Sequence, residues 1–489
     1  MTSFESDFTM TIGGVAAAGT SSFGVVNPAN ELEFAWAPDC SREELDQAVA
    51  AARAAFPGWA ATPYAERQRL VASIAGVLNA NIDGLKRLLT REQGKPHNDA
   101  ASDVLGAAYW CHATSSLELP VTVVEDTADR YGETRHVPIG VVGAIAPWNF
   151  PVLLAFFKVA PALLAGNTLI LKPSPFTPLT TLKIGELLRE VLPPGVFNVI
   201  SGGDSLGPWM TSHPGVDKIS FTGSTQTGRK VMASAAESLK RVTLELGGND
   251  AAIVLPDIDV AAVAEQLFWA AFRNSGQICI ATKRMYVHKD VYEPLKAALV
   301  AYAKTVQVGD GAEQGTRLGP IQNHQQYARV IELIEDAKAK GYTFLIGGER
   351  SAAPGYFVPI SIIDNPPEDS RIVQEEQFGP VLPLLKFDHV DEAVARANAS
   401  DYGLGASIWS ADTDAALAVG ARLQAGTVWI NESQYLSPLA AFGGHKQSGL
   451  GVEGGLKGLL EYTNVKTTFF KKAPRESELK TTAVTRGPA

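Results

Sequence analysis

The stretch Lys218-Ile-Ser-Phe-Thr-Gly-Ser-Thr-Gln-Thr-Gly228 runs from a short apolar segment through a Gly-rich turn into a helical pattern that begins at Arg229. Similar β-branched runs occupy residues 141–146, 168–172, 196–200 and 241–246, and helical patterns alternate with them. Short buried strands that alternate with helices are typical of an open, parallel sheet covered by helices. The sequence therefore predicts an α/β fold.

The Gly-rich turn Gly223–Gly228 is a candidate site for a phosphate group. Between a strand and a helix, such a turn presents backbone N–H groups and the positive end of the helix. It is not a Walker A loop, because Arg229 stands where that motif requires Lys, and Lys230 stands where it requires Ser or Thr. The pattern is compatible with a site for a cofactor pyrophosphate and equally with an ordinary βα turn.

Three further regions complete the organisation of the chain. Apolar residues recur at helical spacing from Ser41 to Glu118, which predicts an N-terminal helical region. The segment from Pro120 to Pro138 alternates in polarity and predicts an exposed hairpin. After Gly247-Gly248 a second α/β series begins and continues through Thr427-Val-Trp-Ile430, so we expect a domain boundary near Gly248.

Composition argues against several classes of protein. The chain has 489 residues, 46% hydrophobic and 19% charged, as in a globular protein of roughly two to four domains. With 42 basic against 52 acidic residues, the net charge of −10 offers no basic block for nucleic acid. Three cysteines cannot build a disulfide framework. Because we identify neither a secretory signal nor a membrane-spanning run, we expect a cytoplasmic protein with no membrane or nucleic-acid partner.

One cysteine has a suggestive context. The segment Phe272-Arg-Asn-Ser-Gly-Gln-Ile-Cys279 follows a long apolar helical run and contains a Gly-Gln pair. A cysteine attacks a carbonyl carbon as the thiolate, which needs partial exposure near positive charge or helix N-terminal amides. Gly276 would let the backbone turn tightly there. Cys279 is therefore a candidate nucleophile, with a buried structural cysteine as the alternative, which is the role we expect for Cys40 and Cys111.

Polar residues near the ends of predicted strands are further candidates. Glu245 ends a strand where open α/β folds place their ligand crevice, so it is either a general base or an exposed strand-end carboxylate. Asn149 lies between two prolines and offers a rigid amide donor for an oxyanion, unless it only shapes a turn. Lys172 places a cation at the same sheet edge, with a surface lysine as the alternative. Either Glu375 or Glu376 is a candidate acceptor for ribose hydroxyls, with a solvated charge pair as the alternative.

Seven motifs, taken together, resemble the NAD(P)-dependent aldehyde dehydrogenase superfamily, and their order and spacing match it through nearly the whole chain. They are Pro147-Trp-Asn-Phe-Pro151, Leu171-Lys-Pro-Ser174, Phe221-Thr-Gly-Ser-Thr225, Leu244-Glu-Leu-Gly-Gly248, Gly276-Gln-Ile-Cys279, Glu376-Gln-Phe-Gly-Pro380 and Phe442-Gly-Gly-His-Lys-Gln-Ser-Gly449. The combination is far more specific than any one motif.

The resemblance implies a division of the chain into domains. It implies a Rossmann-like cofactor domain at 1–118 and 140–247, an α/β catalytic domain at 248–447, a small β oligomerisation element at 119–139 and 463–475, and a tail at 476–489. It also implies that the protein associates with itself as a homodimer or homotetramer.

By the same resemblance, Cys279 is the nucleophile, Glu245 is the general base, and the Asn149 amide forms the oxyanion hole with the Cys279 N–H. Lys158 and Glu453 match positions associated with proton transfer and water activation. Glu376 takes the nicotinamide ribose, and Phe378 packs against the nicotinamide end. The other positions implied for the cofactor are Ile145, Pro147, Trp148, Lys172, Ser174, Pro175, Gly202, Phe221, Gly223, Ser224, Leu246 and Gly247.

These residue types account for an oxidation of an aldehyde to a carboxylic acid. A thiolate adds to the aldehyde, and the two donors stabilise the oxyanion of the thiohemiacetal. Hydride leaves for the nicotinamide, and Glu245 then activates the water that hydrolyses the thioester on Cys279. No step requires a metal, and no His/Cys cluster has the spacing of metal ligands. A non-redox cysteine acyltransferase or thioesterase, or a catalytically silent protein on this fold, is the alternative.

Two positions depart from the family pattern. Pro175 replaces the Glu that often follows Lys-Pro-Ser in NAD-preferring members, where it binds the adenosine ribose hydroxyls. Without that carboxylate to repel a 2′-phosphate, we expect NADP to be tolerated alongside NAD. Asn249 stands where many members have Lys, and no mechanistic expectation follows from it.

The resemblance also implies a mostly apolar substrate tunnel, which favours aliphatic or aromatic aldehydes by about 0.8 kcal/mol per buried methylene. Arg273 leaves an acidic semialdehyde as the alternative, although Phe157 replaces the second arginine of succinate-semialdehyde enzymes. A lone buried Arg would cost free energy, so we favour the hydrophobic aldehyde. No aromatic box is assembled for a quaternary ammonium such as betaine aldehyde. The implied tunnel residues are Phe150, Leu153, Leu154, Phe157, Arg273, Ile278, Ile280, Gln434, Leu436 and Phe442.

Overall fold

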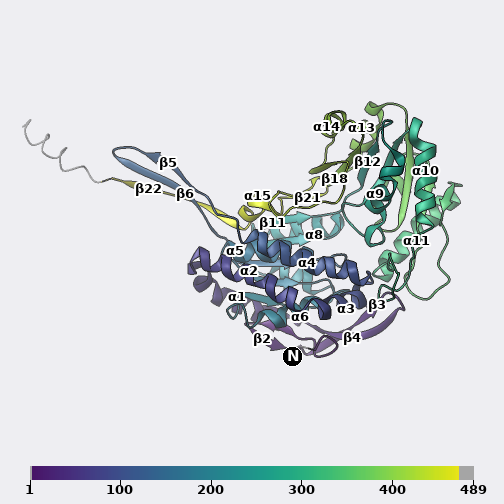
Figure 1. Ribbon diagram of the computed structural model, residues 1–489. Coiled ribbons are helices and arrows are strands. Elements are labelled where there is room, and N and C mark those ends of the chain that lie inside the picture. Colours follow the sequence, from purple (N-terminus) through teal and green to yellow (C-terminus); the bar gives the residue numbers. More distant parts are fainter. Residues whose placement is uncertain (1–2, 473–489) are drawn as a thin grey trace, which may run out of the picture.

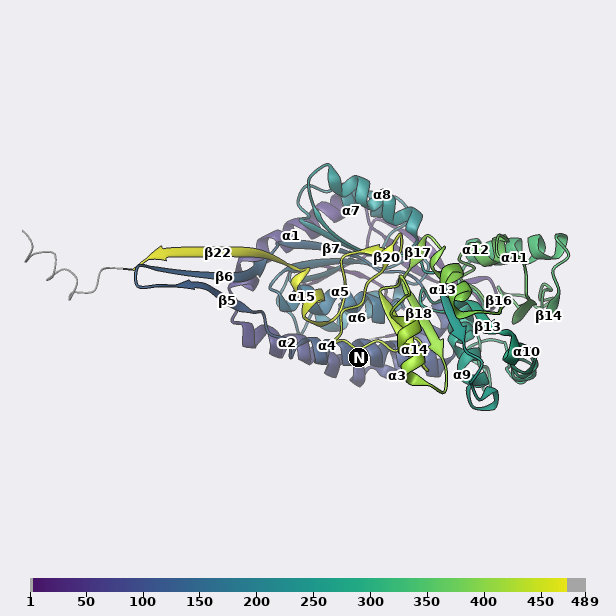
Figure 2. The same ribbon diagram turned by 90° about the horizontal axis from the view of Figure 1, so that it is seen from above.

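The structure is a computed structural model and describes residues 3–472. The tail expected at 476–489, and residues 473–475 of the expected oligomerisation element, lie outside the described residues. Two large sheets with their helices form the body, and a narrow three-stranded arm extends from it (Figures 1 and 2). The architecture is α/β, as the sequence predicts.

The first sheet contains the strand that precedes the Gly-rich turn. Its five central strands are parallel in the order β9-β8-β7-β10-β11, with bounds Phe197–Val199, Thr168–Lys172, Val141–Ile145, Lys218–Thr222 and Arg241–Glu245. All five predicted runs therefore form strands. The strand order reverses between β7 and β10, and open α/β sheets bind ligands beside such a switch, at the carboxyl ends of the strands.

Antiparallel strands close both edges of this sheet. They are β1 (Met10–Ile12) and β2 (Val15–Ala17) at one edge and β21 (Gly449–Leu450) at the other. A hairpin of β3 (Ser21–Asn27) and β4 (Leu32–Asp39) precedes the first helix. Local sequence patterns did not predict these N-terminal strands. The first two are three residues long, and β1 joins the sheet through its pairing with β9, which local patterns do not report.

The predicted N-terminal helical region is confirmed. It folds into α1 (Arg42–Ala61), α2 (Tyr64–Ala80), α3 (Ile82–Gln93) and α4 (His97–Thr114). Ser41 begins it with a capping box, in which its side chain accepts from the Glu44 N–H and the Glu44 carboxylate accepts from the Ser41 N–H. The remaining helices beside the first sheet are α5 (Leu153–Leu164), α6 (Leu179–Leu188), α7 (Leu206–Ser212), α8 (Thr225–Ala236) and α15 (Gly455–Leu460).

The nucleophile candidate, Cys279, lies three residues before β13 (Thr282–His288), the central strand of the second sheet. The order of this sheet is β14-β15-β16-β13-β12-β18-β19, with bounds Phe344–Ile346, Ser361–Asp364, Val381–Phe387, Thr282–His288, Asp250–Val254, Gly405–Trp409 and Thr427–Ile430. Its helices are α9 (Val260–Phe272), α10 (Lys289–Ala303), α11 (His324–Ala339), α12 (Arg371–Gln374), α13 (Val390–Asn398) and α14 (Thr413–Gly420). Successive residues of β12 alternate between two apolar clusters, so both faces of this sheet are buried.

The predicted hairpin and the C-terminal strand form the arm. β5 (Val121–Asp126), β6 (Arg130–Pro138) and β22 (Thr463–Lys471) pair in the order β22-β6-β5. The arm begins beside the first sheet, two residues before β7, and its tip projects away from the body (Figure 2). A small pair of strands, β17 (Tyr402–Gly403) and β20 (His445–Lys446), lies near the end of the second sheet. Among residues 3–472, no helix is both long enough and apolar enough to cross a membrane.

Candidate functional site

The turn that carries Cys279 has an unusual backbone. Asn274, Ser275 and Gly276 have φ values of 51°, 55° and 72° after α9 ends. A Cβ on Gly276 would lie 2.2 Å from the Gly379 carbonyl oxygen, so the close approach requires glycine. The Ser275 hydroxyl donates to the Gly319 carbonyl at 2.7 Å and helps to hold this strained path. The result is a partly exposed Cys279 at the wall of a cavity.

Asn149 lines the same cavity as Cys279. Its side-chain amide donates one hydrogen bond to the Gln277 carbonyl at 2.9 Å, which leaves the second amide hydrogen for a ligand. Its backbone carbonyl accepts from the Lys95 ammonium at 2.8 Å and from the Asn274 amide at 3.2 Å. The structure therefore brings the predicted amide donor to the predicted nucleophile and holds it from both sides.

Glu245 ends β11 and is 5% exposed. Both of its carboxylate oxygens have no hydrogen-bond partner among the described residues. Burial, and then the nearby Glu453 carboxylate, raise the pKa of Glu245 well above its usual value, against the opposing charge of Lys158. The Lys158 ammonium contacts Glu453 at 2.5 Å in a fully buried ion pair. The three predicted residues thus form one buried cluster in which only Glu245 lacks a direct partner among residues 3–472.

The electrostatics of Cys279 favour the neutral thiol at rest. Burial, opposed by the charge of Lys283 and assisted by the carboxylates of Glu376, Asp250 and Glu245, raises the pKa of Cys279 to about 12. Because the thiolate is the nucleophilic form, the resting site needs a base or a compensating charge before Cys279 attacks.

A separate pocket lies beside the carboxyl ends of β7, β8 and β10. Ile145, Lys172, Pro175 and Phe221 line it, as predicted for cofactor residues. Five further lining residues were not predicted, namely Gly203, Asp204, Thr227, Lys230 and Ser234. Burial lowers the pKa of Lys172 to about 8, although Asp204 and Asp39 oppose the shift. Thr227 belongs to the Gly-rich turn 223–228, whereas the other unpredicted residues lie after β9 and on α8 outside any motif, so only their position in the fold identifies them.

The start of α8 closes this pocket. Ser224 is the N-cap of the helix, and its hydroxyl accepts from the Thr227 N–H at 3.2 Å. A Cβ on Gly223 would lie 2.5 Å from the Phe221 ring, so this turn needs glycine. A cationic Lys172, a helix N-terminus and a partly apolar pocket suit a dinucleotide, whose pyrophosphate is anionic and whose adenine is flat.

The remaining cofactor candidates lie between the two sheets. The Glu376 carboxylate accepts from the Gly248 N–H at 3.1 Å, and a Cβ on Gly247 would lie 2.4 Å from it. Phe378 has a φ of 49° and packs edge-on against Trp148 at 5.3 Å between ring centres. The other candidates, Pro147, Ser174, Gly202 and Leu246, lie in the segments that follow β7, β8, β9 and β11.

The cavity next to Cys279 is lined by the predicted tunnel residues Phe150, Leu153, Leu154, Arg273, Ile278, Ile280, Gln434, Leu436 and Phe442. Phe157 does not line it, because its buried ring stacks on Trp110 with 3.6 Å between ring centres. Lys95, Asp99, Ser102, Asp103 and Tyr435 also line the cavity, and no sequence motif pointed to them.

The environment of Arg273 differs from the expectation. We expected a lone buried arginine, but Arg273 is exposed at the cavity, and its charge acts on the pKa of Asp99. The guanidinium is therefore open to solvent, and its charge is near enough to Asp99 to affect the pKa of that carboxyl. Burial raises the pKa of Asp99, and Lys95 and Arg273 oppose that shift.

Comparisons with known proteins agree with one another. The sequence profile of the Aldehyde dehydrogenase family matches residues 15–468. The chain is 44% identical to a "probable aldehyde dehydrogenase" of a Pseudomonas species over 96% of this chain and 95% of that protein. It is 40% identical to the phenylacetaldehyde dehydrogenase of Pseudomonas fluorescens over 94% and 95% of the two chains.

Two solved structures are similar along almost their whole length. The NAD⁺ complex of an aldehyde dehydrogenase from Bacillus cereus has a TM-score of 0.93 and 37% identity, covering 96% of this chain and 97% of that chain. An NADP-dependent enzyme from E. coli has a TM-score of 0.93 and 35% identity, covering 95% and 98%.

Proposed function

Because this chain belongs to the aldehyde dehydrogenase family, we propose that it oxidises an aldehyde to the carboxylic acid with NAD or NADP, using Cys279 as the nucleophile. The observation that carries this proposal is one cavity lined by both Cys279 and Asn149, together with a buried Glu245, unpaired among the described residues, whose charge raises the pKa of the Cys279 thiol.

The residues of the cavity account for the attack and for the charge that it creates. Glu245 takes the proton of the Cys279 thiol, directly or through a water, and the thiolate adds to the aldehyde carbon. The free amide hydrogen of Asn149 and the backbone N–H of Cys279 stabilise the resulting oxyanion. Once bound, a nicotinamide cofactor would accept the hydride that the former aldehyde carbon loses as the oxyanion collapses, and the acyl group would remain on Cys279 as a thioester.

Glu245 completes the reaction. As a carboxylate with a raised pKa, it can accept a proton from the water that hydrolyses the thioester near neutral pH. The Lys158–Glu453 pair lies beside it and offers a route for that proton away from the site. The carboxylic acid then leaves and the thiol is restored.

The cofactor is supported by the pocket at Lys172 and by the names of two structural neighbours, one an NAD⁺ complex and the other NADP-dependent. Lys172, the start of α8 and Phe221 would hold the adenosine and phosphate end. Glu376, Trp148 and Phe378 would hold the nicotinamide end. Pro175 offers no carboxylate to repel a 2′-phosphate, and Lys230 lines the same pocket, so we propose that both cofactors are used.

The substrate is an aliphatic or aromatic aldehyde, and the phenylacetaldehyde dehydrogenase among the relatives is consistent with this class. Eight of the lining side chains are apolar: Phe150, Leu153, Leu154, Ile278, Ile280, Tyr435, Leu436 and Phe442. An acidic semialdehyde is the second candidate, because Arg273 faces the cavity. The charges of the lining are balanced, because Asp103 is paired with Lys95 at 2.8 Å and Asp99 is near enough to Arg273 for the two charges to interact. No unbalanced cation of the lining is therefore left for a substrate carboxylate, so the hydrophobic aldehyde is favoured.

A panel of aldehydes, assayed with NAD and with NADP for the absorbance of reduced nicotinamide, tests the proposal. Hydrophobic aldehydes should give the highest kcat/KM, and Cys279→Ala should abolish turnover while the double variant C40A/C111A retains it. Aldehyde-independent thioester hydrolysis without nicotinamide reduction would instead identify a cysteine thioesterase. No turnover with any aldehyde would favour a silent protein.

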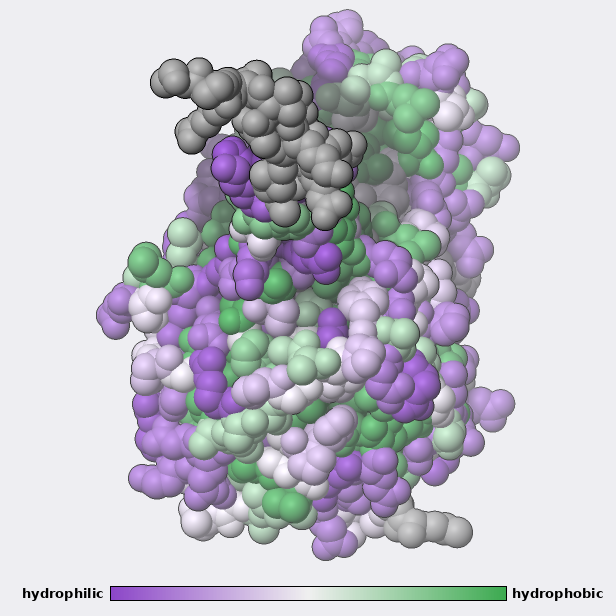
Figure 3. All heavy atoms as spheres, turned by 90° about the vertical axis from the view of Figure 1, so that its left-hand side faces the viewer, coloured by the Kyte–Doolittle hydropathy of each residue, from purple (hydrophilic) through white to green (hydrophobic). Residues whose placement is uncertain are grey.

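We further propose that the arm joins copies of this chain into a homodimer or homotetramer. Its exposed apolar side chains are Val121, Val123, Val124, Val465, Phe469 and Phe470, and β5 is an edge strand. Figure 3 faces the side from which the arm projects, where hydrophobic surface is visible among hydrophilic residues. Unpaired strand edges and apolar patches are covered in stable proteins. Light scattering should report an oligomer, and V124D/F469D should reduce its mass.

The division into domains and the cellular location are also proposals. The cofactor domain spans 1–118 and 140–247, the catalytic domain 248–447, and the oligomerisation element 119–139 and 463–475. Limited proteolysis should cut first near these boundaries. The location is the cytoplasm, and cell fractionation tests it.

A further inference from the structure

Lys283 has no role in the reaction described above, although it lies directly behind the nucleophile. It is on β13, and its side chain is buried. Its ammonium donates to the carbonyl oxygens of Ile278 and Cys279, both at 2.7 Å, and to that of Ala281 at 3.3 Å. Three carbonyl groups of the Cys279 turn therefore converge on one buried cation.

The contact with the Ile278 carbonyl bears on the oxyanion hole. The Ile278 carbonyl and the Cys279 N–H belong to the same peptide group, and peptide groups are planar. A cation that fixes the carbonyl therefore fixes the direction of the N–H. Hydrogen bonds made through one group also polarise each other, so the cation strengthens the N–H as a donor.

The same ammonium reaches the cofactor side of the site. It lies 3.5 Å from a Glu376 carboxylate oxygen, which also accepts from the Gly248 N–H, and 5.9 Å from the centre of the Phe378 ring. Lys283 is thus in contact with the nucleophile turn and with the residues proposed for the nicotinamide end. Without this cation, Glu376 would be a mostly buried carboxylate with no positive neighbour in direct contact among the described residues.

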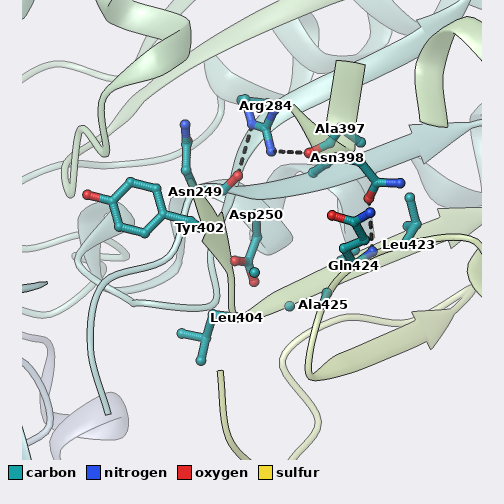
Figure 4. A pocket seen from close by; sticks show the side chains of 14 residues that line it. Asn249, Asp250, Arg284, Ala397, Asn398, Tyr402, Leu404, Leu423, Gln424 and Ala425 are labelled. Atoms are coloured by element: carbon teal, nitrogen blue, oxygen red, sulfur yellow. Dashed lines mark hydrogen bonds between the residues drawn. The ribbon is translucent and has the colours of Figure 1, made fainter. Parts of the chain in front are cut away.

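The next residue along the strand faces elsewhere. Successive side chains of a strand point to opposite sides, and Arg284 faces a separate small pocket, where it donates to the carbonyls of Asn249 and Ala397 (Figure 4). The Asn249 amide donates in turn to the Val373 carbonyl at 2.8 Å. Arg284 therefore holds the residue before β12 and the end of α13, whereas Lys283 contacts the Cys279 turn.

We propose that Lys283 is a positioning residue, which holds the Ile278–Cys279 peptide in the direction that the oxyanion needs and ties that peptide to Glu376. This inference rests on the proposed function, because the direction of that N–H matters only if Cys279 attacks a carbonyl. The charged groups around the thiol are Lys283 from β13, Asp250 from β12, Glu245 from β11 and Glu376 from the segment after α12.

The first test measures the thiol without aldehyde or cofactor. The rate of Cys279 alkylation by iodoacetamide is followed against pH, with C279A giving the background from Cys40 and Cys111. Lys283→Met should shift the midpoint to higher pH and slow alkylation at neutral pH by about tenfold, since one pH unit changes the thiolate fraction tenfold. In K283M/E376Q the pH midpoint of alkylation should return toward the parent value, because the Glu376 carboxylate that K283M leaves unpaired is then absent. A midpoint that is the same in parent, K283M and K283M/E376Q would overturn the proposal.

The second test measures the first turnover. With aldehyde and cofactor, the rate of the nicotinamide burst in K283M should fall at least about tenfold, as expected when an oxyanion donor is weakened rather than removed. Lys183→Met is the matched control, because Lys183 is a buried lysine paired with Glu186 on α6, and it should keep the parent rate. A parent-like burst in K283M would overturn the proposal.

An unfolded K283M variant and a failure of the proposed function give different results. If K283M does not fold, E376Q alone decides, because removal of this carboxylate should move the alkylation midpoint below the parent value, and an unchanged midpoint would contradict the link. If the parent protein oxidises no aldehyde, the proposed function fails, and the alkylation profiles still report whether Lys283 and Glu376 control the thiol.

Discussion

The Lys158 ammonium lies 2.5 Å from the Glu453 carboxylate, and both side chains are buried. The Ser220 hydroxyl donates to the same carboxylate oxygen at 3.4 Å, and the Tyr462 hydroxyl donates to Ser220 at 3.0 Å. Glu245 lies close enough to feel these charges but has no hydrogen-bond partner within residues 3–472. Two buried glutamates therefore have different environments, one ion-paired and one open to a reactant, which suits different roles.

Replacing Lys158 by Met should lower the free energy of unfolding by about 3–5 kcal/mol, because it leaves a buried carboxylate unpaired. The double variant K158M/E453Q should recover part of this loss, since both charges are then absent. Chemical denaturation measures both effects. Glu66→Gln, which breaks an exposed pair with Arg69, is the control and should leave stability unchanged. A K158M protein as stable as its parent would contradict this view of the pair.

The rate of the enzyme should rise with pH. Burial and Glu453 raise the pKa of Glu245, so its carboxylate, the form that acts as a base, appears only as the pH rises through that raised value. In Glu245→Gln this rise of kcat with pH should disappear, and the steady-state kcat should fall by roughly 10²–10⁴-fold. Because Glu245 also takes the proton of the Cys279 thiol in the proposed mechanism, the initial burst of reduced nicotinamide should slow as well. An E245Q profile identical to the parent's would exclude Glu245 as the base.

Asp250 should make stability depend on pH. Burial raises the pKa of Asp250 to about 7 in the folded protein, against about 3.9 for an unfolded chain. A raised folded pKa means that its contribution to stability is complete below pH of about 4 and is lost as the pH rises through about 7. Asp250→Asn should therefore be more stable than the parent above that pH. The urea concentration at the unfolding midpoint, measured against pH for the parent and D250N, tests this prediction. If the two midpoints change with pH in the same way, Asp250 does not titrate as described.

Cofactor choice should respond to one added carboxylate. Pro175→Glu should lower the kcat/KM for NADP at least about tenfold while NAD is retained, because like charges brought close cost several kcal/mol. Pro175→Ser, which adds no charge, is the control. Asp204→Asn, in the same pocket, should shift the ratio toward NADP. A parent that strongly prefers NAD would contradict the dual use proposed here.

Chain length should govern the choice of aldehyde. Each added methylene of a straight-chain aldehyde should increase kcat/KM by about fourfold, equivalent to about 0.8 kcal/mol, until the cavity is filled. Phe442→Ala should weaken this dependence. Arg273→Leu should change it little, because Arg273 is exposed and has acidic neighbours. If R273L instead abolished an efficient oxidation of a semialdehyde, the second candidate substrate would be correct.

The sequence predicted the elements better than their assembly. The runs at 141–146, 168–172, 196–200, 218–222 and 241–246 all became strands, because β-branched residues in short apolar runs favour strands wherever they pack. The strands at 10–12 and 15–17 escaped notice, since three residues carry too little pattern and are held by pairing with a distant strand. Phe157 was assigned to the tunnel by position, yet its ring stacks on Trp110, a contact between α5 and α4 that no motif records.

By itself, the sequence determined the α/β class, the family motifs and the identity of Cys279, Glu245 and Asn149 as candidates, because these depend on local order and spacing. Only the tertiary structure decided the surroundings of those residues. It placed Asp99 beside an exposed Arg273, and it placed Lys283 on the carbonyls of the Cys279 turn. The physical reason is that burial and charge depend on neighbours from several elements at once, and each element alone does not specify which neighbours it will meet.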